Sequence, residues 1–139
     1  MIDEYLKNKI DFRLKQSREK LRLSSIMFKK GLNYKSLVFS YLAMFYAVRL
    51  LLINSKVDSD DHTKIIELIR GYLEPKGWIS IEVFQSLQQT NNSDVKTEND
   101  LDNQVSKEKA EEFLTNAGLV LEEVLAKMAN SHDLSSLNR

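Results

Sequence analysis

Arg49 is the first candidate for a ligand-binding residue in this sequence. It is the only charged residue in the apolar stretch from 40 to 52. An unpaired charge among apolar groups is costly, so the guanidinium must reach either water or a partner. Its planar fork suits a phosphate or a carboxylate in a cleft. Two alternatives stay open: a side chain that packs its stem and reaches solvent near the helix C-terminus, and a buried ion pair.

Three aromatic residues, Tyr41, Phe45 and Tyr46, precede Arg49 within the same stretch. Aromatic rings can stack on nucleobases, so Tyr41 and Tyr46 could bind a base. Aromatic residues at these spacings on a buried helix more often belong to the core. Both interpretations of these rings stay open.

Two further polar residues complete the candidate set. His62 follows two aspartates, but three consecutive residues do not easily converge on one metal ion, so a polar patch at a helix N-terminus is the alternative. Asp94 lies in a polar segment and could cap a helix or hold an arginine. The candidate ligand-binding residues are therefore Tyr41, Arg49, His62 and Asp94. We predict no metal site and no cofactor, since the sequence has no cysteine, Gly-rich phosphate loop, metalloprotease helix or nucleophile elbow.

Helical periodicity predicts five helices that would position these residues. They cover residues 3–30, 34–55, about 60–74, 81–89 and 107 onwards. In the first helix the apolar positions recur at helical spacing, at Leu6, Ile10, Leu14, Leu21 and Phe28. Gly31 is expected to stop that helix, Asn33 to occupy the turn or cap, and Ser106 to cap the last helix.

We therefore predict an all-α fold, an antiparallel up-and-down bundle of about five helices that forms a single domain at residues 1–130. Within it, residues 90–105 are polar and lack helical periodicity, so they are expected to form a long loop. Residues 131–139 are expected to form a flexible C-terminal tail.

The apolar run from Leu37 to Ile53 raises the question of a membrane span. This run is shorter than the ~20 residues that a span needs. It also contains Ser40 and Arg49, and an arginine at mid-span costs about 2.5–3.5 kcal/mol on insertion scales. We predict the most buried helix of a bundle, with no membrane partner. The charged N-terminal sequence lacks the apolar core of a signal peptide, so a cytoplasmic location is expected.

Charge is distributed unevenly along the chain. Residues 1–36 hold ten Lys/Arg against four Asp/Glu, although the net charge of the whole chain is zero. A basic first helix could meet RNA, an acidic partner or an acidic surface of its own fold. The alternative is a solvated helix face on which both signs are mixed.

The order of these segments, with residues 40–52 at its centre, resembles the HEPN (higher eukaryote and prokaryote nucleotide-binding) domain family. Family members often carry the pattern Ser-Tyr-Tyr-Ala-Met-Phe-His-Ala-Ala-Arg-Ala-Leu-Leu at this place in the chain. The matching residues are Ser40, Tyr41, Ala43, Met44, Phe45, Ala47, Arg49, Leu51 and Leu52, whereas Leu42, Tyr46, Val48 and Leu50 differ. His62 also falls where the family often has a histidine that opens its third helix. The resemblance extends over residues 5–129.

The resemblance implies a compact helical bundle, commonly a homodimer, with roles that include nucleotide or RNA binding, ribonuclease toxins and partnership with a small nucleotidyltransferase. The nuclease members carry an arginine followed, after four to six residues, by a histidine, which places a phosphate clamp beside a general acid–base. Neither His62 nor His132 follows an arginine at that spacing. Another branch carries Arg-x-x-Ala-Asp-Tyr after its fourth helix, and here only Asp94 of residues 90–95 matches.

The function predicted from the sequence is a HEPN-like binding module with little or no catalytic activity, a homodimer that binds a nucleotide, RNA or a protein partner. A toxin–antitoxin or nucleotidyltransferase-linked system is the setting that the resemblance allows. Two alternatives stay open: a ribonuclease with a non-standard active site around Arg49 and His62, and a purely structural adaptor.

Overall fold

The computed structural model describes residues 4–54, 61–77 and 105–129, and every regular element in those ranges is an α-helix. The helices are α1 (Glu4–Lys29), α2 (Asn33–Asn54), α3 (His62–Leu73) and α6 (Lys107–Ala129). The prediction of an all-α bundle is confirmed. The predicted helix at 81–89, the polar segment before residue 105 and the tail at 131–139 lie outside the described residues.

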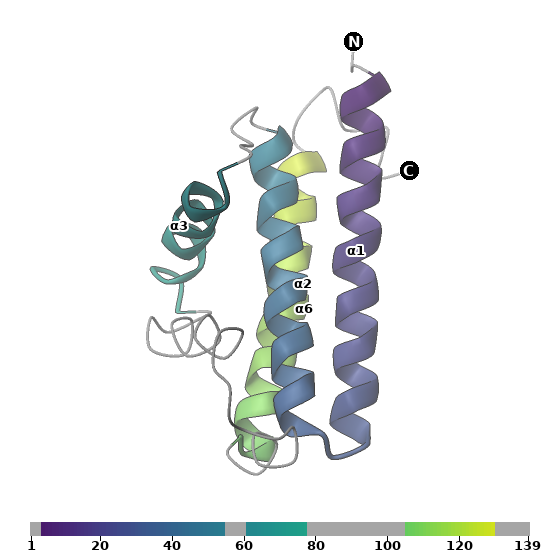
Figure 1. The fold of residues 1–139 in the computed structure, drawn as a ribbon, viewed down its shortest axis with the longest axis vertical. Coiled ribbons are helices and arrows are strands. Elements are labelled where there is room, and N and C mark those ends of the chain that lie inside the picture. The colour runs from purple at the N-terminus through teal and green to yellow at the C-terminus, as the bar shows by residue number, and fades with distance from the viewer. Residues whose placement is uncertain (1–3, 55–60, 78–104, 130–139) are drawn as a thin grey trace.

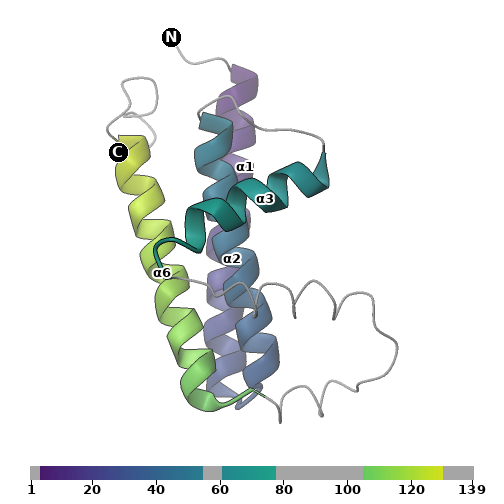
Figure 2. The same cartoon turned by 90° about the vertical axis from the view of Figure 1, so that its left-hand side faces the viewer.

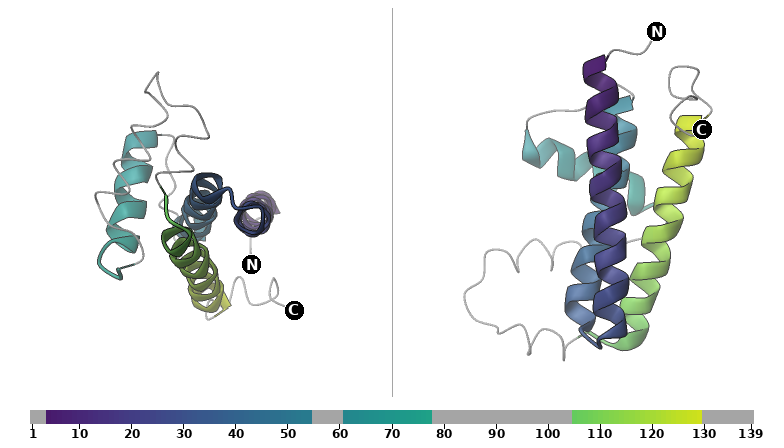
Figure 3. Two further views of the ribbon diagram at one scale, coloured as in Figure 1. Left: turned by 90° about the horizontal axis from the view of Figure 1, so that it is seen from below. Right: turned by 90° about the vertical axis from the view of Figure 1, so that its right-hand side faces the viewer.

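The three long helices run side by side, with α1 antiparallel to both α2 and α6 (Figure 1). The short helix α3 crosses α2 and approaches α6 (Figure 2). Viewed from one end, α1, α2 and α6 form a triangle, and α3 lies on the side of it that faces away from α1 (Figure 3). The helix α2 therefore has neighbours on several sides, which explains its apolar sequence.

The turn between α1 and α2 is built as the sequence predicts, around a glycine. Gly31 has a φ of 77°, a left-handed conformation that suits glycine. The amide of Gly31 donates to the carbonyl of Phe28 at 3.0 Å, and the amide of Leu32 donates to the carbonyl of Met27 at 2.9 Å. This pair of bonds is a Schellman motif, which satisfies the last carbonyls of α1.

The N-terminal ends of the other helices depend on polar side chains. Asn33 is the first residue of α2 rather than its cap, and its Nδ2 donates to the carbonyl of Val105 at 3.0 Å, just before α6. Ser106 caps α6 as predicted, because its Oγ accepts a bond from the amide of Lys109 at 3.0 Å. Asp61 caps α3, so this helix begins slightly later than the sequence suggested.

The core is centred on α2, as predicted. Half of the residues of α2 are buried, whereas α1 buries only Ile10, Ser17 and Ser24. By length and composition α2 is the one described helix that could cross a membrane, and most of its apolar stretch is buried inside the bundle. The neighbouring helices α1, α3 and α6 cover the apolar surface of α2.

A hydrogen-bonded row of serines joins α1 to α2. Ser17, Ser24, Ser36 and Ser40 are all fully buried. The Oγ of Ser24 lies 2.6 Å from the Oγ of Ser40, and the Oγ of Ser36 donates to the carbonyl of Ser24 at 3.0 Å. The Oγ of Ser17 donates to the carbonyl of Ala43 at 2.8 Å. We call these four residues the serine seam. Their short side chains let the two helices pack closely while every buried hydroxyl keeps a partner.

Polar contacts join the C-terminal end of α3 to α6. The hydroxyl of Tyr72 donates to Oε2 of Glu123, and Nζ of Lys76 lies 3.5 Å from the same oxygen. The ammonium groups of Lys76 and Lys127 lie 4.9 and 5.1 Å from the centroid of the Tyr72 ring. These four residues form the Tyr72 cluster. It supplements the apolar contacts of α3, in which Ile65, Ile69 and Leu73 are buried.

Candidate functional site

The helices α1 and α2 carry a strong excess of positive charge. The sequence of α1 contains eight Lys/Arg and three Asp/Glu. The sequence of α2 contains Lys35 and Arg49 and no acidic residue. In contrast, α6 contains five glutamates and three lysines. An anionic ligand would therefore be attracted to the α1–α2 side of the molecule.

A row of aromatic and polar side chains lies beside the buried side of α1. Tyr5, Lys9, Phe12 and Gln16 follow one another at the three- and four-residue spacing that places side chains on one helix face. Tyr5 is 72% exposed and Phe12 is 56% exposed. Among the described residues, these are two of the three large apolar side chains that folding leaves exposed, and the third is Leu119 on α6.

Arg13 occupies the junction between this row and α2. The central carbon of its guanidinium lies 5.4 Å from the centroid of the Phe12 ring and 5.9 Å from that of Tyr46. Its Nη1 donates to Oε1 of Gln16 at 2.8 Å. Tyr46 packs edge-on against the buried Phe45, with centroids 5.6 Å apart and planes at 88°. Arg13 thus contacts two aromatic rings, of which Tyr46 packs against the core.

A second cation is held across the two helices in the same way. Nζ of Lys20, two turns after Arg13 on α1, lies 5.5 Å from the centroid of the Phe39 ring on α2. Arg49 follows Tyr46 by three residues, so helical spacing places both on one side of α2. We call this surface the basic face, and its members are Tyr5, Lys9, Phe12, Arg13, Gln16, Lys20, Phe39, Tyr46 and Arg49.

The structure describes the side chains of two of the four residues that the sequence singled out, Tyr41 and Arg49. Tyr41 is only 7% exposed and contacts Phe45 in the core, with ring centroids 6.3 Å apart. Arg49 is half-buried near the C-terminal end of α2. His62 begins α3, and neither its side chain nor Asp94 is among the described parts of the chain. The ligand-binding role of all four stays a prediction.

Sequence reasoning missed Phe12, Arg13 and Lys20. Phe12 stands among charged residues and outside the predicted apolar stripe of the first helix. Its signal was the seven-residue separation from Tyr5, which places two aromatic rings on one helix face. The contacts of Arg13 and Lys20 with α2 depend on how the two helices align, and periodicity within one helix does not give that alignment.

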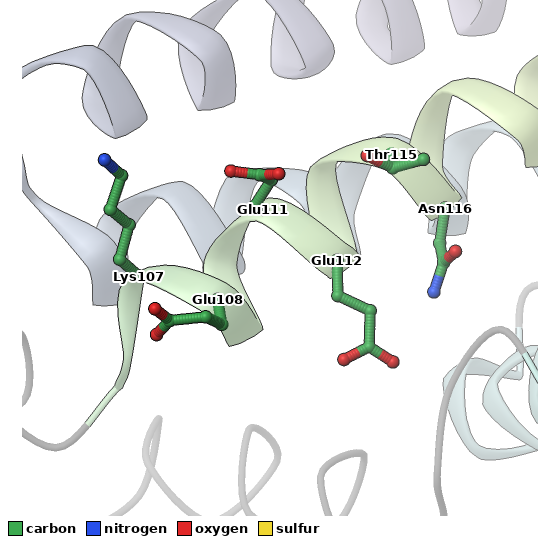
Figure 4. A pocket seen from close by; sticks show the side chains of 6 residues that line it. All are labelled: Lys107, Glu108, Glu111, Glu112, Thr115 and Asn116. Atoms are coloured by element: carbon green, nitrogen blue, oxygen red, sulfur yellow. The ribbon is translucent and has the colours of Figure 1, made fainter.

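The surface of α6 has a depression, but the side chains that line it diverge. It is lined by Lys107, Glu108, Glu111, Glu112, Thr115 and Asn116. Figure 4 shows that Lys107 and Glu111 point to one side of the helix, whereas Glu112 and Asn116 point to the other. Within the described ranges, no group of three or more His, Cys, Asp or Glu side chains could hold a metal ion. This depression therefore lacks the convergent groups that a ligand site needs.

In the Tyr72 cluster, the pKa values of Tyr72 and Glu123 are shifted, and both shifts follow from a contact that joins two helices. Burial and the hydrogen bond to Glu123 raise the pKa of Tyr72 well above its ordinary value. The same hydrogen bond, followed by the nearby charges of Lys76 and Lys127, lowers the pKa of Glu123. Tyr72 thus stays a donor and Glu123 an anionic acceptor at neutral pH, as a contact between two helices requires.

The fold and the basic face together define a helical module with a surface suited to anions. A comparison with protein families adds the family: the model of the HEPN domain matches residues 10–128. The chain therefore belongs to the HEPN domain family. In the companion comparisons, no curated protein and no solved structure gave a match.

Proposed function

We propose that this protein is a HEPN-type binding module that holds a phosphate-bearing ligand, RNA or a nucleotide, on its basic face. The observation that carries this proposal is a pair of cations on α1 that contact aromatic rings of α2. Arg13 lies near the rings of Phe12 and Tyr46, and Lys20 lies near the ring of Phe39. A guanidinium is a good ligand for phosphate because its planar fork can donate two parallel hydrogen bonds. Holding the cation in place before binding reduces the entropy lost on binding.

The basic face is poorly suited to pairing with its own copy, because like charges would meet across the interface. We therefore propose that the homodimer expected for this family uses other surfaces and leaves the basic face accessible. Light scattering should show a dimer whose mass is unchanged when Arg13 and Lys20 are both replaced by glutamine. A monomer at micromolar concentration would contradict the dimer, and a monomer in the variant alone would place Arg13 and Lys20 in the interface.

The binding proposal can be tested by fluorescence anisotropy with a labelled RNA of 12 nucleotides. The double variant Arg13→Gln/Lys20→Gln should weaken binding by about tenfold or more, and should lower the slope of log affinity against log salt by about 1.4. The matched control is Lys15→Gln/Arg18→Gln, which removes the same charge from other sides of α1, where both residues are exposed. An equal loss of RNA affinity in the two double variants would contradict the proposal, because it would mean that RNA responds only to the total charge of α1.

The ribonuclease alternative depends on a group that can take and return a proton, and His62 is the candidate on which it rests. Two aspartates precede His62 in the sequence and would repel a phosphodiester. We therefore expect purified protein to bind labelled single-stranded RNA without cutting it, with or without a chelator. Cleavage that His62→Ala abolishes would make this protein a nuclease and contradict the non-catalytic proposal.

The biological setting that we propose is cytoplasmic, in a toxin–antitoxin or nucleotidyltransferase-linked pair. It is supported by the family alone. A nucleotidyltransferase that copurifies with the protein, and does so equally with Arg13→Gln/Lys20→Gln, would favour this setting. A partner that the variant loses would instead bind the basic face directly and compete with RNA.

A further inference from the structure

We infer that the ligand of the basic face is a flexible single-stranded polynucleotide several residues long, whose bases stack on Phe12 and Tyr5 along the N-terminal half of α1. The inference rests on the proposed function, and it narrows the ligand from any phosphate-bearing molecule to one class. A mononucleotide and a double helix are the two classes that it excludes.

The spacing of the two exposed rings carries the first step. Tyr5 and Phe12 are seven residues apart on one face of α1, which corresponds to about 10 Å along the helix axis at a rise of ~1.5 Å per residue. Lys9 lies between them on the same face, and Arg13 follows Phe12. Aromatic and cationic side chains therefore alternate along α1. One mononucleotide has a single base and cannot occupy both rings, whereas a chain of nucleotides offers repeating bases and phosphates that match this alternation.

The exposure of the rings carries the second step. Phe12 and Tyr5 remain 56% and 72% exposed, so folding leaves much of their surface available to a ligand. In a double helix the base faces are stacked on one another, and a protein reaches only base edges and phosphates. A duplex would use the cations of the basic face and leave the exposed parts of the two aromatic rings without a base to stack on. An unpaired strand uses both kinds of side chain.

The charged side chains near the row of Tyr5, Lys9, Phe12 and Gln16 also favour a polyanion. Glu19 is the acidic residue nearest to Phe12 in the C-terminal direction, and its carboxylate is bound by Arg22 at 3.0 and 2.5 Å. This ion pair lowers the pKa of Glu19 and masks part of its charge. Glu4 and Asp11 directly precede Tyr5 and Phe12, but a rotation of ~100° per residue places their carboxylates off this row of side chains. Within the row of Tyr5, Lys9, Phe12 and Gln16, the charged member is the cation Lys9. A polyanion can therefore follow the row without meeting a carboxylate in it.

The experiment compares three ligands on wild-type protein and on ring variants. The ligands are a single-stranded RNA of 12 nucleotides, a 12-base-pair duplex that contains the same strand, and AMP. Wild-type protein should bind the single strand most tightly and AMP most weakly. Phe12→Leu keeps an apolar, helix-favouring side chain but removes the ring. Since stacking of one base is worth about 5- to 150-fold in affinity, Phe12→Leu should weaken single-strand binding at least fivefold. Duplex binding should fall by a smaller factor, because the variant also removes one of the two rings near the Arg13 guanidinium.

Two controls separate loss of the ring from other effects. Phe12→Tyr restores a ring and should restore binding of the single strand, and Leu119→Ala removes the exposed apolar side chain of α6 and should change nothing. Equal affinity for strand and duplex, with no effect of Phe12→Leu, would overturn the inference. If Arg13→Gln/Lys20→Gln still weakened binding in that case, the proposed function would stand. Failure of wild-type protein to bind any of the three ligands would overturn both.

Discussion

The side of α1 that packs against α2 and the adjacent basic face differ in their side chains and in the roles that we assign to them. The side that packs against α2 buries Ile10, Ser17 and Ser24 at seven-residue intervals, and the leucines at 6, 14 and 21 pack beside them. The adjacent basic face carries long side chains, two of which, Tyr5 and Phe12, remain mostly exposed. Stability should therefore depend on the serine seam, and binding should depend on the basic face. Substitutions that affect one property and leave the other unchanged can test this division.

The largest expected effect on stability is that of Ser24→Leu. Ser24 is fully buried and its Oγ contacts Ser36 and Ser40 at 3.1 and 2.6 Å, so a leucine would force α1 and α2 apart. We expect a loss of about 3 kcal/mol in the free energy of unfolding, measured by urea denaturation. Phe12→Leu serves as the comparison and should change this free energy by less than about 0.5 kcal/mol. Similar losses at both positions would mean that folding depends on the basic face as well.

A smaller loss is expected from Ser17→Ala, which removes one hydrogen bond without adding volume. The hydroxyl of Ser17 donates to the carbonyl of Ala43 at 2.8 Å in a fully buried position. Deleting it leaves that carbonyl without this donor, which costs about 1 kcal/mol. Urea denaturation measures the change, and RNA affinity measured on the same preparation should stay at the wild-type value. A variant as stable as wild type would show that the seam acts through close packing alone.

Arg49 offers a test of how far the basic face extends along α2. If Arg49 takes part in binding, Arg49→Lys should weaken binding of the RNA of 12 nucleotides by about two- to tenfold, because lysine lacks the planar fork. Fluorescence anisotropy measures the effect, with Lys35→Arg as a control that keeps both cations of α2. Unchanged affinity in both Arg49→Lys and Arg49→Ala would favour an arginine that only reaches solvent, and would end the basic face at Tyr46.

The smallest effect concerns the Tyr72 cluster. The pKa of Glu123 lies below its ordinary value of 4.5, chiefly because of the hydrogen bond from Tyr72. A carboxyl with a lowered pKa stabilises the fold above its ordinary pKa, and this contribution is lost as the pH falls through the lowered value. Tyr72→Phe should raise the pKa of Glu123 and remove part of this pH dependence, at a cost below about 0.5 kcal/mol at pH 7. An NMR titration of the Glu123 carboxyl that shows the same pKa in both proteins would contradict the hydrogen bond from Tyr72 as the cause of the lowered pKa.

The sequence predicted local features well and contacts between helices poorly. Gly31 and Ser106 act as helix signals because a stop or a cap depends on a few neighbouring residues. The apolar stretch around Met44 predicted a buried helix for a similarly direct reason. The serine seam was missed because serine is usually a surface residue, and its burial becomes favourable only when a second helix supplies partners.

The candidate site shows the same limit. The sequence drew attention to Tyr41, Arg49 and their aromatic neighbours, because charge and rings stand out in an apolar stretch. The structure places Tyr41 in the core and leaves Arg49 half-buried. It places Arg13 of α1 against Tyr46 of α2, a contact that depends on the alignment of two helices. Periodicity along one helix contains no information on that alignment.

The most direct test of the central claim is an NMR titration of uniformly nitrogen-labelled protein with an unlabelled single-stranded RNA of 12 nucleotides. The basic face predicts that backbone amide shifts change in residues 5–20 of α1 and 39–49 of α2, and that the outer surface of α6 at residues 108–122 stays unchanged. The same titration with Arg13→Gln/Lys20→Gln should show much smaller changes at the same positions. Changes centred on α6, or none at saturating RNA, would contradict the claim that the basic face of α1 and α2 is where this HEPN domain binds its ligand.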